Sequence, residues 1–193
     1  MSRKPPPPKK PRRGGELHEP RTAEERARDL LLRLETSGPN PQNAAEELDR
    51  LQGKLERDGQ LEDFRDRVAE LAGAWSGNSL RGERGQAWLT LVGGFDLKEN
   101  VGRVAEIVED PGLPTALRVH ACRVLPTLKG EVAVRALQGV LLSRTDAQVR
   151  VAAADGLALI GDRSVAPVLE VMLDEDLPRN VWSAVSAAFD RLR

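Results

Sequence analysis

The chain has 193 residues, of which 31% are charged and 40% hydrophobic, enough for one domain with an apolar core. Aromatic residues make up 3% and tyrosine is absent, which argues against an aromatic-rich β-sandwich and against a base-stacking surface. The formal charge is −1, and no apolar run approaches the ~18–20 residues of a membrane span. These numbers argue against a polyanion-binding surface over the whole molecule and against a membrane-spanning helix.

The first 21 residues differ from the rest in charge and proline content. Residues 1–20 hold six basic and two acidic side chains, a net charge of +4. The six basic residues are Arg3, Lys4, Lys9, Lys10, Arg12 and Arg13. Four consecutive prolines and few apolar residues predict a disordered, extended tail over residues 1–21. Such a tail suits nucleic acid, an anionic surface, an acidic protein or, through its PxxP pattern, a peptide-binding groove; a solubilising role is the alternative.

Three helices are predicted over residues 22–76. Thr22 and Glu25 fit a capping box at the start of the first helix. Asn40 followed by Pro41 predicts the start of the second helix, with the asparagine as its cap. Apolar residues spaced by three and four indicate a third helix that ends near Trp75. Residues 77–85 contain three glycines and are expected to form a loop.

Beyond residue 86 the sequence repeats with a period of 32 residues, and eight sets of aligned positions are apolar throughout. They are Leu117/Val149/Val181, Ala121/Ala153/Val185, Leu125/Leu157/Phe189, Leu128/Ile160/Leu192, Val101/Ala133/Val165, Val104/Ala136/Val168, Ala105/Leu137/Leu169 and Val108/Val140/Met172. Spacings of three and four within each helix place these residues on one helical face. One helix pair cannot bury such a face alone, so we predict an all-α fold in which residues 86–193 form a short α-solenoid.

The segment AQVRVAAADGLALIGDRSVAPVL (147–169) resembles a HEAT repeat of the short kind found in bacterial HEAT-like proteins. Arg150, Leu157 and Pro167 stand where that pattern expects them, as do an Ala-Ala pair and an Ile-Gly-Asp turn. The resemblance implies that Arg118 and Arg150 form a structural ladder with acidic turn residues such as Asp146. It covers about half of the chain and says little about activity, because such repeats serve many functions.

The resemblance also implies that the second helix of each pair lines a groove. The exposed residues expected there have mixed charge, which suits a protein partner better than a nucleic-acid duplex. The candidate partner-binding residues are Arg103, Glu106, Arg135, Gln138 and Glu170. A plain solvated face is the alternative.

Enzymatic chemistry finds little support in the sequence. His120 and Cys122 lie two residues apart, on different sides of a helix, so they do not form a metal site together. Deoxyhypusine hydroxylase has similar repeats with His-Glu pairs, but the one such pair here, His18-Glu19, lies in the tail. HEAT-like phycobilin lyases and alkylpurine glycosylases are the remaining enzymatic alternatives. We expect no cofactor and no metal.

The favoured function is a non-catalytic scaffold or adaptor that binds another protein through the repeat groove, with the tail as a second contact. The alternative is a nucleic-acid-associated protein anchored by its basic tail. The single cysteine cannot form an internal disulfide, which suits a reducing compartment, so we expect a cytoplasmic protein. The last predicted helix lacks a following partner, which suggests self-association through residues 177–193.

Overall fold

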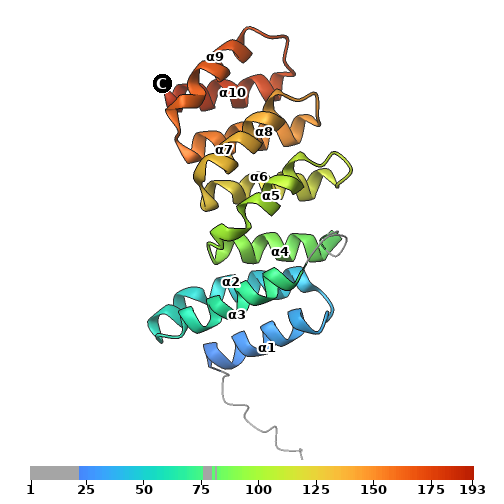
Figure 1. Ribbon diagram of the computed structural model, residues 1–193, viewed down its shortest axis with the longest axis vertical. Helices are drawn as coiled ribbons and strands as arrows, with labels where there is room; N and C mark the ends of the chain where they lie inside the picture. Colours follow the sequence, from blue (N-terminus) through green and yellow to red (C-terminus); the bar gives the residue numbers. More distant parts are fainter. Residues whose placement is uncertain (1–21, 76–79, 81) are drawn as a thin grey trace, which may run out of the picture.

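The computed structural model describes residues 22–75, 80 and 82–193; the basic tail (1–21) and residues 77–79 and 81 of the predicted loop lie outside the described residues. The described residues form ten α-helices and no strand, so the predicted all-α fold is confirmed. The helices are α1 (Ala23–Glu35), α2 (Pro41–Arg57), α3 (Leu61–Ala74), α4 (Gly82–Gly94), α5 (Val101–Glu109), α6 (Thr115–Leu128), α7 (Gly130–Leu142), α8 (Ala147–Ile160), α9 (Ala166–Leu173) and α10 (Arg179–Leu192). They are stacked along the long axis of the molecule, from α1 to the α9–α10 pair (Figure 1).

Helices α1 and α2 both begin where the sequence predicts, but only α1 has a side-chain cap. Thr22 Oγ1 accepts from the backbone N–H of Glu25, and the Glu25 carboxylate accepts from the backbone N–H of Thr22, as a capping box requires. Asn40 occupies the N-cap position of α2, but its side chain makes no capping hydrogen bond. Its φ of 55° is left-handed, whereas a capping side chain reaches the first amides from extended backbone.

The helices form two rows. The first-helix row consists of α2, α4, α6, α8 and α10, and each of these packs against the next. The second-helix row consists of α5, α7 and α9, each of which packs against one or two members of the first row. In the second row α5 and α7 also pack against each other. The solenoid is therefore continuous through its first-helix row.

The 32-residue pattern describes the core of this stack. Every residue of the eight apolar sets is buried or half-buried. Small residues allow close packing, and Gly156 shows this best: an added Cβ would lie 3.0 Å from the carbonyl oxygen of Cys122 and 3.1 Å from a methyl of Leu137. A repeated apolar face and small residues at the contacts thus position the helix pairs.

Helix α4 begins inside the segment that we expected to be a loop. Residues 82–85 are helical, and an added Cβ at Gly85 would lie 2.0 Å from the carbonyl oxygen of Leu80. The Leu80 carbonyl therefore lies against a position in α4 that only glycine fits. Because α4 packs against both α2 and α6, the predicted division into residues 22–76 and 86–193 stays a prediction.

Helix α10, which was expected to lack a following partner, nevertheless buries most of its apolar residues. Val185 and Leu192 are buried, because α10 packs against α8 and α9. On the outer side of α10, the positions of the buried Ala154 and Ala158 in α8 are taken by Ser186 and the exposed Asp190. Self-association through residues 177–193 stays a prediction.

Candidate functional site

The candidate partner-binding residues lie on the second-helix row. Glu106 is on α5, Arg135 and Gln138 are on α7, and Glu170 is on α9. Gln138 is half-buried and the other three are exposed. Arg135 pairs with Glu131 at 3.6 Å, but both side chains are largely in water, where such a pair contributes little. Because α5 packs against α7 and Glu106 and Gln138 stand one 32-residue period apart, these two residues occupy equivalent positions on neighbouring helices, with Arg135 one turn before Gln138.

Arg103, the fifth candidate, has a different role in the structure. Its guanidinium donates to the backbone carbonyls of Ala72, at 3.0 Å, and of Trp75, at the end of α3. It also lies over the ring of Trp88, 4.7 Å from the ring centre, and the Trp88 indole donates to the same Ala72 carbonyl at 3.0 Å. Arg103, near the start of α5, therefore joins the C-terminal end of α3 to the middle of α4, and it is half-buried.

Arg118 and Arg150 do form a repeated structural feature, but the expected acidic partners are wrong. Arg118 Nε donates to the carbonyl of Val108 at 2.9 Å, and Arg150 Nε donates to the carbonyl of Leu141 at 2.9 Å. Both acceptors are the penultimate residues of second-row helices, whose last carbonyls have no acceptor role within the helix. Asp146 instead caps α8, because its carboxylate accepts from the backbone N–H of Gln148 at 2.7 Å.

The third position in this column, Trp182, makes the same kind of contact with a different side chain. Its indole Nε1 donates to the carbonyl of Leu173, the last residue of α9, at 3.3 Å. The tryptophan is 45% exposed, whereas Arg118 and Arg150 are 5% and 9% exposed. The column of Arg118, Arg150 and Trp182 therefore closes the ends of α5, α7 and α9, and it is structural.

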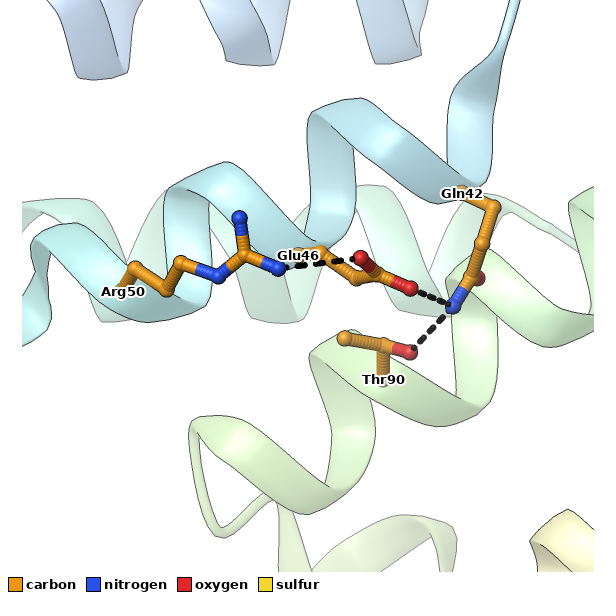
Figure 2. Close-up of polar contacts among 4 residues, drawn as sticks. All are labelled: Gln42, Glu46, Arg50 and Thr90. Atoms are coloured by element: carbon orange, nitrogen blue, oxygen red, sulfur yellow. Dashed lines mark hydrogen bonds and ion pairs between the residues drawn. The ribbon is translucent and has the colours of Figure 1, made fainter.

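The outer face of the first-helix row has polar side chains that contact one another at its N-terminal end. Gln42 Nε2 donates to Glu46 Oε1 at 2.9 Å and to Thr90 Oγ1 at 3.2 Å, so it joins α2 to α4 (Figure 2). The other Glu46 oxygen accepts from Arg50 at 3.2 Å. These side chains are already engaged with one another.

A cleft lies at the C-terminal end of the same face, between α6, α8 and α10. Its volume is about 270 Å³. The lining residues are Val119, Arg123, Gln148, Val151, Ala152, Asp155 and Asn180. The sequence pattern did not predict this cleft, although Arg123 and Asp155, like Gln148 and Asn180, stand one 32-residue period apart.

Two groups near this face have shifted pKa values. Burial raises the pKa of the Cys122 thiol to about 12, so the thiol stays protonated at neutral pH and is a poor nucleophile. Burial, reinforced by the Arg123 charge, lowers the pKa of His120, whose Nδ1 pairs with Oε1 of Gln86 across α4 and α6. Both residues thus fit packing roles within the stack.

The part of the chain that the structure describes holds neither a metal cluster nor a membrane-spanning helix. Within residues 22–75, 80 and 82–193, no group of three or more His, Cys, Asp or Glu side chains is placed to hold a metal ion. No helix in these ranges is long and apolar enough to cross a membrane.

Paired helices stacked in two rows, closed by a repeated capping column, define the class of the protein as a short α-solenoid. The sequence model of the family described as HEAT repeats matches residues 105–188, from α5 to α10. These residues are therefore HEAT repeats, and the resemblance inferred from residues 147–169 is confirmed. No curated protein and no solved structure matches the chain.

Proposed function

We propose that this protein is a non-catalytic, cytoplasmic scaffold or adaptor that binds a partner protein through the second-helix row. The observation that carries the proposal is the HEAT-repeat array at residues 105–188 with its exposed side chains of mixed charge. Stacked repeats offer an extended surface of this kind to partners. Glu106, Arg135, Gln138 and Glu170 are the residues that would contact the partner.

Arg103 is left out of the binding set, because its guanidinium holds the end of α3. Substituting it would disturb packing and binding together. The exposed Glu106 and Arg135 are better probes, since charge reversal there leaves the buried side of α5 and α7 intact.

The basic tail is the proposed second contact. Two weak sites on one chain raise the apparent affinity, because binding at the first increases the local concentration at the second. The six basic residues of the tail would make this contact salt-sensitive.

The experiment is capture of partners from native lysate by the wild-type protein and by the double variant Glu106→Arg/Arg135→Glu. Glu56→Arg/Arg57→Glu, at the exposed C-terminal end of α2, is the matched control with the same change of charge. We expect the control to retain a specific partner and the second-helix variant to lose it. Equal retention by both variants would contradict the proposed surface.

The charge of +4 in residues 1–20 favours the second candidate function, a nucleic-acid-associated protein. Under that function, duplex DNA or RNA binds with a steep dependence on salt, and deletion of residues 1–13 abolishes the binding. Under the adaptor function, partner capture survives the same deletion.

A further inference from the structure

We propose that the cleft between α6, α8 and α10 binds an extended peptide segment in the polyproline II conformation, with an acidic and a basic side chain three residues apart. The cleft opens on the first-helix row, whereas the proposed partner surface lies on the second. The inference therefore adds a second binding site, and the chain would hold two protein segments at once.

The cleft combines an apolar floor with polar side chains at its edge. Val119 and Val151 are half-buried and Ala152 is buried, so they offer apolar contact without a deep cavity. Arg123, Gln148, Asp155 and Asn180 are exposed. A volume of about 270 Å³ leaves room for one or two side chains of a ligand.

The four polar side chains of the cleft are available to a ligand. None of them makes a hydrogen bond or ion pair with another residue in the described ranges. This sets the cleft apart from the N-terminal end of the same face, where Gln42, Glu46, Arg50 and Thr90 bind one another (Figure 2). The same row thus changes from internally paired to unpaired polar groups as it passes from α2–α4 to α6–α10.

Charge determines the class of ligand. Arg123 on α6 and Asp155 on α8 occupy equivalent positions one repeat apart, so the cleft presents one cation and one anion. A nucleic-acid strand, which carries a uniform negative charge, would be repelled by Asp155. A peptide that carries one acidic and one basic side chain complements both groups.

Spacing determines the ligand's conformation. Packed helices lie ~8–10 Å apart. Because α6 packs against α8, we take this spacing for the equivalent positions of Arg123 and Asp155. A polyproline II segment rises ~3.1 Å per residue with three residues per turn, so residues three apart share one side and lie ~9 Å apart. In a β-strand, residues three apart point to opposite sides. In the polyproline II form, therefore, peptide residues three apart have the same spacing as neighbouring helices, so that one residue can contact each helix.

The side-chain amides complete the match. A polyproline II backbone makes no internal hydrogen bonds, so its carbonyls and its remaining N–H groups need outside partners. Gln148 and Asn180, at equivalent positions on α8 and α10, each carry both a donor and an acceptor. The two amides can bind the peptide backbone whatever side chains the peptide carries. Arg123 and Asp155 select peptides with one acidic and one basic side chain.

The test uses synthetic, end-capped eight-residue peptides with Asp-Pro-Leu-Arg at the centre, in which the charges are three residues apart. Matched peptides of the same composition place the charges two or four apart. Binding to the full chain is measured by fluorescence anisotropy. We expect the three-apart peptide to bind at least tenfold more tightly than the other two. Equal binding of all three, or no binding, would overturn the proposal.

Charge exchange tests the contact itself. Arg123→Asp should bind Asp-Pro-Leu-Arg at least tenfold more weakly than wild type and should bind Arg-Pro-Leu-Arg more tightly than wild type does. Because Arg123 is exposed, folding is unaffected, and gained binding cannot come from misfolding. If the wild-type protein binds a single-stranded oligonucleotide more tightly than the peptide, and Arg123→Asp loses this binding, the ligand of the cleft is nucleic acid and the peptide proposal is overturned.

The second-helix variant Glu106→Arg/Arg135→Glu separates this inference from the proposed function. It should bind the three-apart peptide as wild type does. If the peptide fails while partner capture succeeds, only the cleft proposal falls; if capture fails while the peptide binds, only the second-helix surface falls.

Discussion

Arg150 Nε donates to the carbonyl of Leu141 at 2.9 Å, nine residues earlier in the chain, and so closes the end of α7 from the neighbouring helix α8. Arg118 makes the equivalent contact with Val108. A helix leaves its last four carbonyls without intrahelical donors, and burial makes such groups costly when unpaired. The arginine is thus a C-terminal cap that the next helix supplies in two successive repeats, and Trp182 takes its place in the third.

Removing this cap should destabilise the array. Arg150 is 9% exposed, and Arg150→Ala leaves the Leu141 carbonyl without its charged donor, so we expect the free energy of unfolding to fall by ~2–3 kcal/mol. Arg150→Lys should recover little, since a lysine lacks the Nε–H of the guanidinium. Urea unfolding measures both, with the exposed Arg163→Ala as the control, expected within ~0.5 kcal/mol of wild type. A stability of Arg150→Ala equal to that of Arg163→Ala would show that the cap is unimportant.

An arginine at position 182 should preserve stability, because arginine occupies the equivalent positions 118 and 150. The indole donates one hydrogen bond to Leu173, and Arg118 and Arg150 show that a guanidinium can serve the equivalent carbonyls. Trp182→Arg should therefore lie within ~0.5 kcal/mol of wild type, whereas Trp182→Ala should lose ~1–2 kcal/mol through the lost hydrogen bond and packing. The urea midpoint at constant m-value checks this. A Trp182→Arg variant as unstable as Trp182→Ala would contradict the shared role.

Two glycines at helical positions should respond to alanine in opposite directions. A Cβ added at Gly139 in α7 would meet no atom within 4 Å, so Gly139→Ala should stabilise the protein by ~0.5–1 kcal/mol through helix propensity. A Cβ added at Gly156 in α8 would lie 3.0 Å from the Cys122 carbonyl oxygen and 3.1 Å from a Leu137 methyl, so that α6 and α7 must yield. Gly156→Ala should therefore destabilise the protein by ~1–3 kcal/mol despite the same gain in propensity. Thermal unfolding of the two variants and of wild type measures both changes in stability. A Gly156→Ala variant more stable than wild type would show that α6 and α8 separate easily.

The 32-residue pattern predicted the core well, because positions that stay apolar from repeat to repeat are the positions that are buried. Leu117, Val149 and Val181 recur at one period and are all buried, and the Thr22–Glu25 capping box depends on local chemistry alone. The partners of Arg118 and Arg150 were not predictable in this way. A guanidinium can donate to a carboxylate or to a backbone carbonyl, and the acceptor here follows from where the preceding helix ends.

The sequence predicts part of the cleft, namely the equivalent positions of its charged residues. The unpaired residues Arg123 and Asp155 stand one period apart, but so do several exposed pairs on the second-helix row. Which exposed positions surround a hollow depends on how closely α6, α8 and α10 approach, and that distance follows from small side chains such as Ala152 within the contact. Spacing predicts which face a residue occupies, whereas the shape of that face requires the packed structure.

His120 should make the stability depend on pH near neutrality. Burial lowers its pKa in the folded protein, whereas in the unfolded chain the pKa is near its ordinary 6.5. Below pH 6.5 the unfolded chain therefore takes up a proton that the folded protein does not, so the free energy of unfolding falls as the pH drops through 6.5 towards the folded pKa. Above about pH 7.5 both states are neutral and the effect vanishes.

The variant His120→Gln isolates this contribution. Urea unfolding of wild type and variant between about pH 5.5 and 8 gives two profiles, and their difference removes the other histidine, His18, which both proteins share. We expect wild type to lose stability relative to the variant below pH 6.5, with a slope limited to one proton, ~1.4 kcal/mol per pH unit. Parallel profiles would mean that His120 takes up its proton equally in the folded and the unfolded protein, and that burial does not lower its pKa.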